Sequence, residues 1–143
     1  MILKIFKFLL ITFVTFNAYA DCYDYAGSQF GISPKLLSAI SQVESNQKSG
    51  RISKVNSNGT YDMGIMQVNS SHLKKLQILG INRTDVVDND CINILIGAYL
   101  LKKNHLYYNN SLQAIGAYNA GYLNDKNELR LKYAKKVRNM LVK

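Results

Sequence analysis

Glu44 ends a segment whose pattern otherwise predicts a buried amphipathic helix. Ser33 offers an N-cap, and Pro34 occupies the first helical position, where its missing N–H costs nothing. Apolar side chains then recur at helical spacing on one face, at Leu36, Leu37, Ile40 and Val43. Glu44 continues this apolar stripe, and a carboxylate in such a position is energetically expensive unless the protein uses it. The segment therefore predicts a helix over 34–45 that carries a partly buried acid.

The position of Glu44 predicts a raised pKa. Partial burial disfavours the charged form, and the C-terminal end of a helix presents a negative dipole, so both effects favour the protonated acid. A carboxylic acid that stays protonated near neutral pH can supply the proton needed to break a glycosidic bond. The alternative is a glutamate at the edge of the helix that points into water.

The first twenty residues have the three parts of a secretory signal peptide. Lys4 and Lys7 form a basic start, a short apolar run follows, and residues 18–20 (Ala-Tyr-Ala) form a small-x-small cleavage site. We therefore predict a signal peptide over 1–20 and one mature domain over 21–143, exported to the periplasm. The alternative is an uncleaved anchor. No later segment approaches transmembrane length, so we expect no membrane insertion of the mature chain.

The chain has two cysteines, Cys22 and Cys91. In an exported protein a lone pair is most simply a disulfide, here between the mature N-terminus and a helix in the middle of the chain. Closing such a loop contributes roughly 4 kcal/mol in the chain-entropy model. The alternative is two free thiols. His72 and His105 are not at ligand spacing, so we expect no metal site and no cofactor.

The chain is strongly basic, with a formal net charge of +9 at pH 7. This charge favours nucleic acid, an anionic membrane or an acidic polymer such as a cell wall as partner, and export argues against nucleic acid. Much of the charge lies over residues 126–138, where it suits the solvated face of a last helix. The chain has ten tyrosines and no tryptophan. Tyrosine suits a groove that holds sugars, because it combines an apolar ring with a polar tip.

The rest of the chain predicts a mainly α fold with one small β excursion. Further helices are predicted over 22–30, from Asn69 or Ser70 to Leu79, from Asp88 or Asn89, from Ser111, and around 129–137. The side chains expected to face the core of the last three are Ile92, Leu95, Ile96, Tyr99 and Leu100, then Leu112, Ile115 and Tyr118, then Leu129, Tyr133 and Val137. The polar residues 46–62 contain the pair Asn58-Gly59, which predicts a small β-hairpin or an irregular loop.

Three short blocks stand far apart in the sequence: Glu44-Ser45, residues 64–67 (Gly-Ile-Met-Gln) and residues 117–121 (Ala-Tyr-Asn-Ala-Gly). In this order and at these separations they resemble the lytic transglycosylase family with a goose-type-lysozyme-like domain. Residues 31–34 and 133–137 also match the pattern of that family, so the resemblance covers about residues 22–140. The small size, the signal peptide and the cysteine pair resemble the specialised members that accompany type III secretion, conjugation or pilus machines.

This resemblance implies a lysozyme-like helical fold and a catalytic role for Glu44. The acid would protonate the oxygen between N-acetylmuramic acid and N-acetylglucosamine. It would then act as base on the 6-hydroxyl of the muramic sugar, which closes a 1,6-anhydro ring. Such a reaction consumes no water and requires no second carboxylate, unlike ordinary glycoside hydrolysis.

The resemblance also implies a set of substrate-binding residues: Ser45, Gly64, Met66, Gln67, Tyr118, Asn119 and Tyr133. Glycine lets the backbone approach the glycan, and Gln67 offers both a donor and an acceptor. Each of three positions keeps a plainer interpretation. Ser45 suits the end of a helix, Met66 suits the core after a glycine turn, and Tyr133 suits core packing.

Asp62 lies two residues before Gly64 and is the second candidate catalytic residue. A hairpin folded over the groove would bring it towards Glu44, where it would raise the pKa of Glu44 by like-charge repulsion or orient a water for hydrolysis. The alternative is a solvated turn aspartate.

The sequence is therefore compatible with three functions. The first is a lytic transglycosylase that opens the wall locally for a secretion or conjugation apparatus. The second is a lysozyme-type hydrolase that uses Asp62, and the third is a glycan-binding assembly factor without chemistry. We expect a monomer whose partners are peptidoglycan glycan strands and a secretion-apparatus protein.

Overall fold

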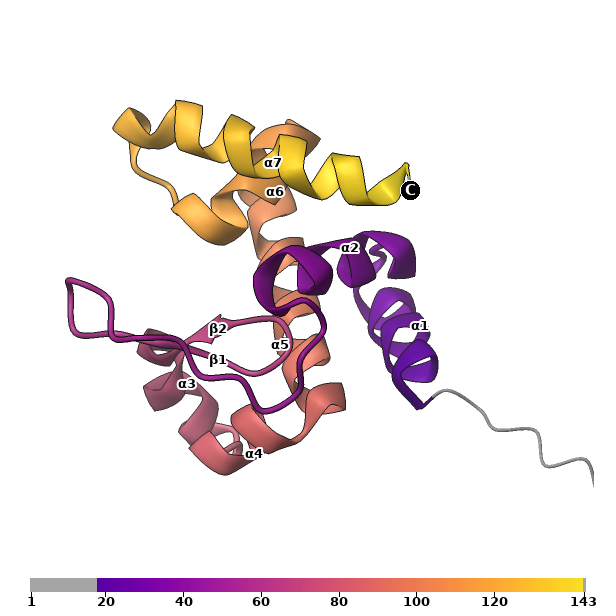
Figure 1. Cartoon of the computed structure of the whole chain (residues 1–143), viewed down its shortest axis with the longest axis vertical. Coiled ribbons are helices and arrows are strands. Elements are labelled where there is room, and N and C mark those ends of the chain that lie inside the picture. The colour runs from indigo at the N-terminus through magenta and orange to yellow at the C-terminus, as the bar shows by residue number, and fades with distance from the viewer. Residues whose placement is uncertain (1–17, 143) are drawn as a thin grey trace, which may run out of the picture.

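Helix α5 (Asp90–Tyr107) runs through the centre of the molecule, and the other elements are arranged around it (Figure 1). The computed structural model describes residues 18–142. The predicted signal peptide therefore lies outside the described residues, apart from its last three positions. Within the described residues, none of the helices combines the length and the hydropathy that crossing a bilayer requires.

Short connections join the elements, except for the long irregular loop over residues 46–61 between the second helix and the first strand. In chain order they are α1 (Ala18–Phe30), α2 (Pro34–Ser45), β1 (Asp62–Met63), β2 (Val68–Asn69), the 3₁₀ turn η1 (Ser70–His72), α3 (Leu73–Ile78), α4 (Arg83–Asp88), α5, α6 (Ser111–Ala120), η2 (Asn124–Lys126) and α7 (Asn127–Leu141). The predicted mainly helical fold with a small β region is confirmed, and the helix predicted over 34–45 has the predicted bounds. Helix α4 is an element that the sequence did not predict.

Helices α1 and α2 form one side of the molecule. Helix α1 packs against α5, and α2 packs against α7 (Figure 1). The predicted disulfide joins Cys22 in α1 to Cys91 in the first turn of α5, with 5.2 Å between their Cα atoms. The bridge therefore fastens the first described helix to the central one.

The β-hairpin forms later in the chain than the sequence predicted. Strand β1 pairs antiparallel with β2, with Asp62 opposite Asn69 and Met63 opposite Val68, so the hairpin closes over residues 64–67. The pair Asn58-Gly59 lies in the irregular loop before β1, which is the second of the two structures predicted for residues 46–62. The tip of this loop projects away from the helices (Figure 1). The hairpin forms at 62–69 because Asn93 of α5 donates to the Met63 carbonyl and accepts from the Met66 N–H.

The buried face of α5 differs from the predicted one. Ile96 is buried as expected, but Tyr99 is 53% exposed, and Ile92, Leu95 and Leu100 are only partly buried. The core side instead carries Asn93, Ile94, Gly97, Ala98 and Leu101. Small and polar residues face inward because the hairpin and α6 approach closely: a Cβ on Gly97 would lie 2.8 Å from Met66 Cε and 2.9 Å from the Tyr118 hydroxyl.

Some side chains that were predicted to face the core from α6 and α7 are exposed instead. Tyr133 and Val137 are buried as expected, but Leu112 is 40% exposed and Leu129 is 54% exposed. Arg130 is buried in place of Leu129, because its guanidinium has hydrogen-bond acceptors between α6 and α7. The cap of α6 is Asn110 rather than Ser111.

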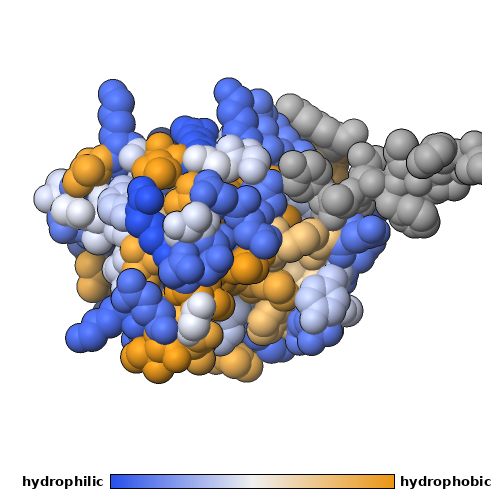
Figure 2. Space-filling view, turned by 90° about the horizontal axis from the view of Figure 1, so that it is seen from below, coloured by the Kyte–Doolittle hydropathy of each residue, from blue (hydrophilic) through white to orange (hydrophobic). Residues whose placement is uncertain are grey.

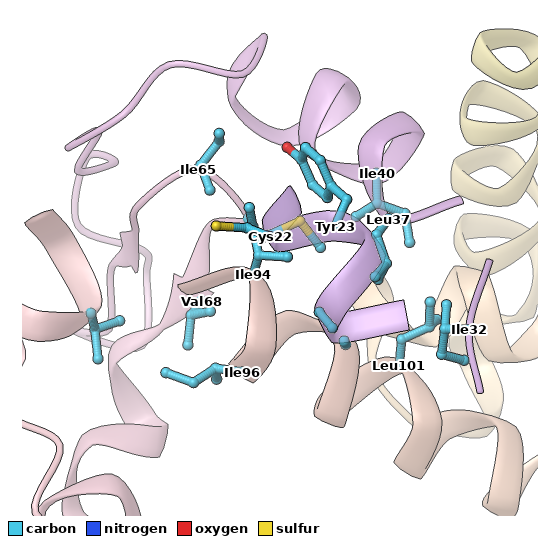
Figure 3. Packing of buried hydrophobic residues seen from close by; sticks show 14 of the residues in the cluster. Cys22, Tyr23, Ile32, Leu37, Ile40, Ile65, Val68, Ile94, Ile96 and Leu101 are labelled. Atoms are coloured by element: carbon cyan, nitrogen blue, oxygen red, sulfur yellow. The ribbon is translucent and has the colours of Figure 1, made fainter. Parts of the chain in front are cut away.

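A single hydrophobic core joins the helices to the hairpin. Figure 3 shows side chains from α1, α2 and α5 beside Ile65 and Val68 of the hairpin region. Leu37 and Ile40 of α2 are fully buried in this cluster, as are Ile94 and Leu101 of α5. The apolar face of α2 therefore fixes the helix whose last turn carries Glu44.

Candidate active site

A cleft of about 680 Å³ separates the hairpin region from the ends of α5 and α6. Glu44, Asp62, Gln67, Tyr118 and Asn119 line it, and their convergence was the central prediction from the sequence. A second hollow of about 380 Å³ adjoins the cleft on the side of α7. Glu44 and Asn119 line both spaces, so Glu44 lies where they meet.

The Glu44 carboxyl is largely withdrawn from water. Burial raises its pKa to about 7 from an ordinary value of 4.5. A hydrogen bond from Tyr133 opposes this rise, the negative charge of Asp62 adds to it, and the charges of Arg51 and Lys136 oppose it weakly. Desolvation dominates the balance, so a large fraction of Glu44 stays protonated at neutral pH.

Tyr133 of α7 contacts the Glu44 carboxyl, although the two residues are far apart in the sequence. Its hydroxyl donates to Glu44 Oε1, and its ring is buried. Burial and the neighbouring Glu44 charge both raise the pKa of Tyr133, so the phenol remains a donor. Tyr133 therefore orients the carboxyl.

Asp62 has a different environment on the opposite wall. Asn69 Nδ2 donates to its Oδ1 at 2.8 Å, and Asn56 Nδ2 lies 3.4 Å from its Oδ2. The Ser53 hydroxyl accepts from the Asp62 backbone N–H at 2.8 Å. The hairpin therefore holds this carboxylate in a ring of polar groups, in the same cleft as Glu44.

The buried side chain of Asn93 fixes the backbone around residues 64–67. Asn93 of α5 is fully buried, and its Oδ1 accepts from the Met66 N–H at 2.7 Å. Its Nδ2 donates to the carbonyls of Met63 and Val86 at 2.9 and 2.8 Å. Gly64 is required here, since its φ is +74° and a Cβ would lie 2.2 Å from Asn93 Nδ2.

Several predicted substrate-binding residues lie behind the cleft wall. Met66 is fully buried in the core. Ser45 is also fully buried, and its hydroxyl donates to the Ile65 carbonyl at 2.7 Å. The structure does not bring Gly64, Met66 or Ser45 to the lining of the cleft. They connect the end of α2, which carries Glu44, to the hairpin.

Three other predicted residues line the cleft. The Tyr118 hydroxyl donates to the Met66 carbonyl at 2.9 Å, so it ties α6 to the hairpin as well. Gln67 Nε2 donates to the Gly64 carbonyl at 2.9 Å, with the backbone of Gln67 in the left-handed region at φ 51°. Asn119 is exposed at the rim.

Sequence reasoning missed much of the lining. Side chains rich in amides and hydroxyls surround the cleft, including Asn56, Ser57, Asn58, Thr60, Asn69 and Asn104. The missed scaffold residue is Asn93, and its signal was an amide between Ile92 and Ile94 in an apolar helix. Within residues 18–142 no group of three or more His, Cys, Asp or Glu side chains is placed to hold a metal.

The comparison with known families identifies the chain. A family model described as "Transglycosylase SLT domain" matches residues 21–141. The chain belongs to the SLT transglycosylase family. It is a peptidoglycan lytic transglycosylase, which places its work in the periplasm or outside the cell.

Individual relatives agree with this assignment. This chain is 39% identical over 133 residues to the "Invasion protein IagB" of Salmonella typhimurium, covering 92% of this chain and 82% of that protein. It is 40% identical over 135 residues to a "Peptidoglycan-binding-like protein" of Escherichia coli O157:H7, covering 90% of this chain and 80% of that one.

A solved structure shares the fold. An inactive mutant of the lytic transglycosylase Slt from Pseudomonas aeruginosa superposes with a TM-score of 0.66 at 23% identity. The match covers 87% of this chain and 23% of the much longer Slt chain. This likeness confirms the predicted lysozyme-like helical fold.

Proposed function

We propose that the chain cleaves the β-1,4 bond between N-acetylmuramic acid and N-acetylglucosamine and leaves a 1,6-anhydro end on the muramic sugar. The observation that carries this proposal is the Glu44 carboxyl, desolvated in the cleft with a pKa of about 7. An acid with this pKa donates a proton readily near neutral pH and accepts one readily after ionising. Both halves of the reaction need these properties.

In the first step, Glu44 donates its proton to the glycosidic oxygen. The bond from that oxygen to C1 of the muramic sugar breaks, and the N-acetylglucosamine side leaves with a free 4-hydroxyl. The acetamido oxygen of the muramic sugar stabilises the positive charge at C1. In the second step, the Glu44 carboxylate takes the proton of the 6-hydroxyl while O6 bonds to C1, which regenerates the acid without consuming water.

The surrounding residues divide into two groups in this proposal. Tyr133 orients Glu44 by donating to Oε1, and we assign the proton transfers to Oε2. Gln67 and Asn119 bind the sugar and its acetamido group from the rim, and Tyr118 contacts the glycan with its ring. Ser45, Gly64 and Met66 act from behind the wall by keeping the hairpin at a fixed distance from α2.

A hydrolytic reaction is the second candidate function. The observation that favours it is Asp62, whose carboxylate lines the same cleft and whose charge raises the pKa of Glu44. In that reaction Asp62 would orient a water for attack at C1, and the product would carry an ordinary reducing end. The polar ring around Asp62 instead supports a role in positioning and electrostatics, because its oxygens already accept hydrogen bonds.

The cellular setting belongs to the same proposal. Residues 1–20 direct export to the periplasm, and the mature enzyme acts as a monomer. It opens gaps in the wall for a secretion or conjugation apparatus, one protein of which recruits it. The name of the Salmonella relative, an invasion protein, supports this role. A pull-down from envelope extract that recovers no apparatus protein would count against recruitment.

The test is mass spectrometry of the soluble products after digestion of purified peptidoglycan in H₂¹⁸O. The proposal predicts anhydro products, one water lighter than hydrolytic ones and without ¹⁸O, from the wild type and none from Glu44→Gln. Reducing ends that carry ¹⁸O would establish the hydrolase instead. Equal release by wild type and Glu44→Gln would remove Glu44 from the mechanism.

A further inference from the structure

An apolar trough of about 450 Å³ lies between α3 and α5, beside the end of α1. Its lining includes Phe30 of α1, Leu76 and Leu79 of α3, and Leu95, Tyr99 and Leu100 of α5. The catalytic cleft is lined instead by side chains rich in amides and hydroxyls. The proposed cleavage of glycan uses none of the trough residues, so their apolar surface is available for another role.

The trough has a buried floor and an exposed rim. Leu76 and Ile96 form the floor, and both side chains are buried. On the rim Leu79 is 74% exposed, and Tyr99 is exposed although its ring packs edge-on against Phe30 with 6.1 Å between centroids. Figure 2 shows hydrophobic side chains in patches among hydrophilic ones on one face of the molecule. Because exposed apolar area is common on this protein, the shape and charge of the trough decide what it binds.

The charge around the trough is positive. Lys75 and Lys103 line it together with His72. Burial lowers the pKa of His72, and the charges of Lys103 and Lys75 lower it further, so His72 is neutral at pH 7 and the two lysines supply the charge. Residues 63–84 and 91–124 contain no Asp or Glu. The lysines therefore have no acidic neighbour on α3, or on α5 after its first residue, and they favour a ligand that carries carboxylates.

Shape and charge together favour a protein helix as the ligand. A second copy of this chain would place lysines against lysines at the rim. The surface of a bilayer would contact the rim but would not reach Leu76 and Ile96 between the two helices. An amphipathic helix presents apolar side chains that enter such a groove, with charged side chains on its flanks. The net charge of +9 also favours an acidic partner.

We propose that the trough between α3 and α5 is the docking groove for an amphipathic helix of a partner protein, one that carries Asp or Glu beside its apolar face. The apolar side chains of that helix insert between Leu79 and Tyr99, and its carboxylates pair with Lys75 and Lys103. The inference rests on the recruitment stated under the proposed function and gives the recruiting protein a binding surface. Lys103 lines both the trough and the catalytic cleft, whereas Glu44 lines only the cleft. A docked helix therefore lies beside the cleft and leaves the acid accessible.

The test is photo-cross-linking of the full-length protein in the cells that produce it, with p-benzoylphenylalanine in place of Tyr99. Mass spectrometry then identifies the cross-linked segment, which is expected to be an amphipathic helix with Asp or Glu beside its apolar face. The matched control carries the same group in place of Tyr25, an equally exposed tyrosine of α1 that does not line the trough. It should not capture that segment.

Two further variants test the two halves of the surface. Lys75→Glu in the cross-linking protein should lower the yield about fivefold, because an ion pair becomes a repulsion. Leu79→Ser should lower it about tenfold through the loss of apolar contact. Lys135→Glu, at an exposed lysine of α7 outside the trough, should leave the yield unchanged. Purified Lys75→Glu and Leu79→Ser proteins should solubilise glycan at the wild-type rate, which shows that they are folded.

Three results would overturn the docking groove. Cross-links from position 99 to lipid alone would assign the face to a membrane surface. Capture of the same segment from position 25, or a yield unaffected by Lys75→Glu and Leu79→Ser, would place the partner elsewhere and leave recruitment intact. No cross-link above that at position 25 would leave the trough without a partner. Failure of the purified wild type to solubilise glycan would count against the proposed cleavage, and the cross-linking would still decide the docking groove.

Discussion

The two carboxylates of the cleft have opposite surroundings. Glu44 lies at the end of a buried helix, where a single tyrosine donates to it and desolvation raises its pKa to about 7. Asp62 lies on a polar hairpin, where asparagine amides and a serine surround it. The difference indicates that burial makes Glu44 the acid of the cleft, whereas the polar groups of the hairpin hold the Asp62 side chain in position.

The largest expected effect is the loss of catalysis in Glu44→Gln. Glutamine keeps the shape of the side chain but has no acidic proton to donate. The rate should fall by about 10³-fold or more, in line with the upper range for general acid–base catalysis. Initial rates of glycan solubilisation measure it, with Glu128→Gln on the exposed face of α7 as control. A loss below about tenfold would assign the acid to another group.

The next effect is on stability, because the pKa of Glu44 is raised in the folded protein. Below pH 4.5 the acid is protonated in both folded and unfolded chains, and it contributes nothing. Between pH 4.5 and about 7 it ionises first in the unfolded chain, so the free energy of unfolding falls as the pH rises.

This penalty is complete above pH 7 and amounts to at most about 3 kcal/mol. Glu44→Gln removes this penalty. The difference in the free energy of unfolding, variant minus wild type, should therefore increase by at most about 3 kcal/mol between pH 4 and pH 8. Urea unfolding of both proteins across this range gives the difference. Parallel curves would mean that Glu44 ionises normally in the folded state.

A smaller effect is expected from Asp62→Asn. Loss of the like charge should lower the pKa of Glu44, so the basic limb of the kcat/KM profile should move to lower pH. The rate at pH 6 should fall by less than about tenfold, the cost of one positioning interaction of about 1 kcal/mol. Asp88→Asn, an exposed aspartate of α4, is the matched control. A loss as large as that of Glu44→Gln would make Asp62 a catalytic partner.

The smallest effect is expected from Tyr133→Phe. Its hydroxyl lowers the pKa of Glu44, so its removal should move the basic limb to higher pH, opposite to the shift in Asp62→Asn. The rate on the acidic plateau should change only a few-fold, since the acid itself remains. The double variant should show partial cancellation of the two shifts. Shifts of the same sign would contradict the electrostatic account of the cleft.

Local patterns predicted the parts of the molecule that depend on a single element. The bounds of α2 and the acid at its end were predicted from the sequence and are present in the structure. Helical spacing and caps determine such features within a few residues of chain. The Cys22–Cys91 bridge, which joins two helices, was predicted instead from a lone cysteine pair in an exported chain, and it is also present. The convergence of Gln67, Tyr118 and Asn119 with Glu44 on one cleft followed from the resemblance rather than from spacing.

The sequence predictions were wrong where contacts between distant parts of the chain determine the structure. The hairpin at 62–69 depends on Asn93, thirty residues from Met63, and no local pattern marks that pairing. Arg130 is buried because a backbone carbonyl at the end of α6 accepts a hydrogen bond from it. Helical periodicity alone predicts an apolar residue at such a buried position. The resemblance predicted substrate-binding roles for Ser45, Gly64 and Met66, because these residues belong to the matching sequence blocks. In the structure they lie in the protein interior, where they contact other parts of the chain.

The pKa of Glu44 in the folded protein is the most direct test of its role as the acid of the cleft. The chain has two glutamates, Glu44 and Glu128, so ¹³C labelling of glutamate carboxyl groups gives two side-chain signals, and Glu44→Gln assigns them. We expect the Glu44 signal to titrate with a midpoint of about 7. A midpoint near the ordinary value of 4.5 would contradict the claim that desolvation makes this residue the acid of the cleft.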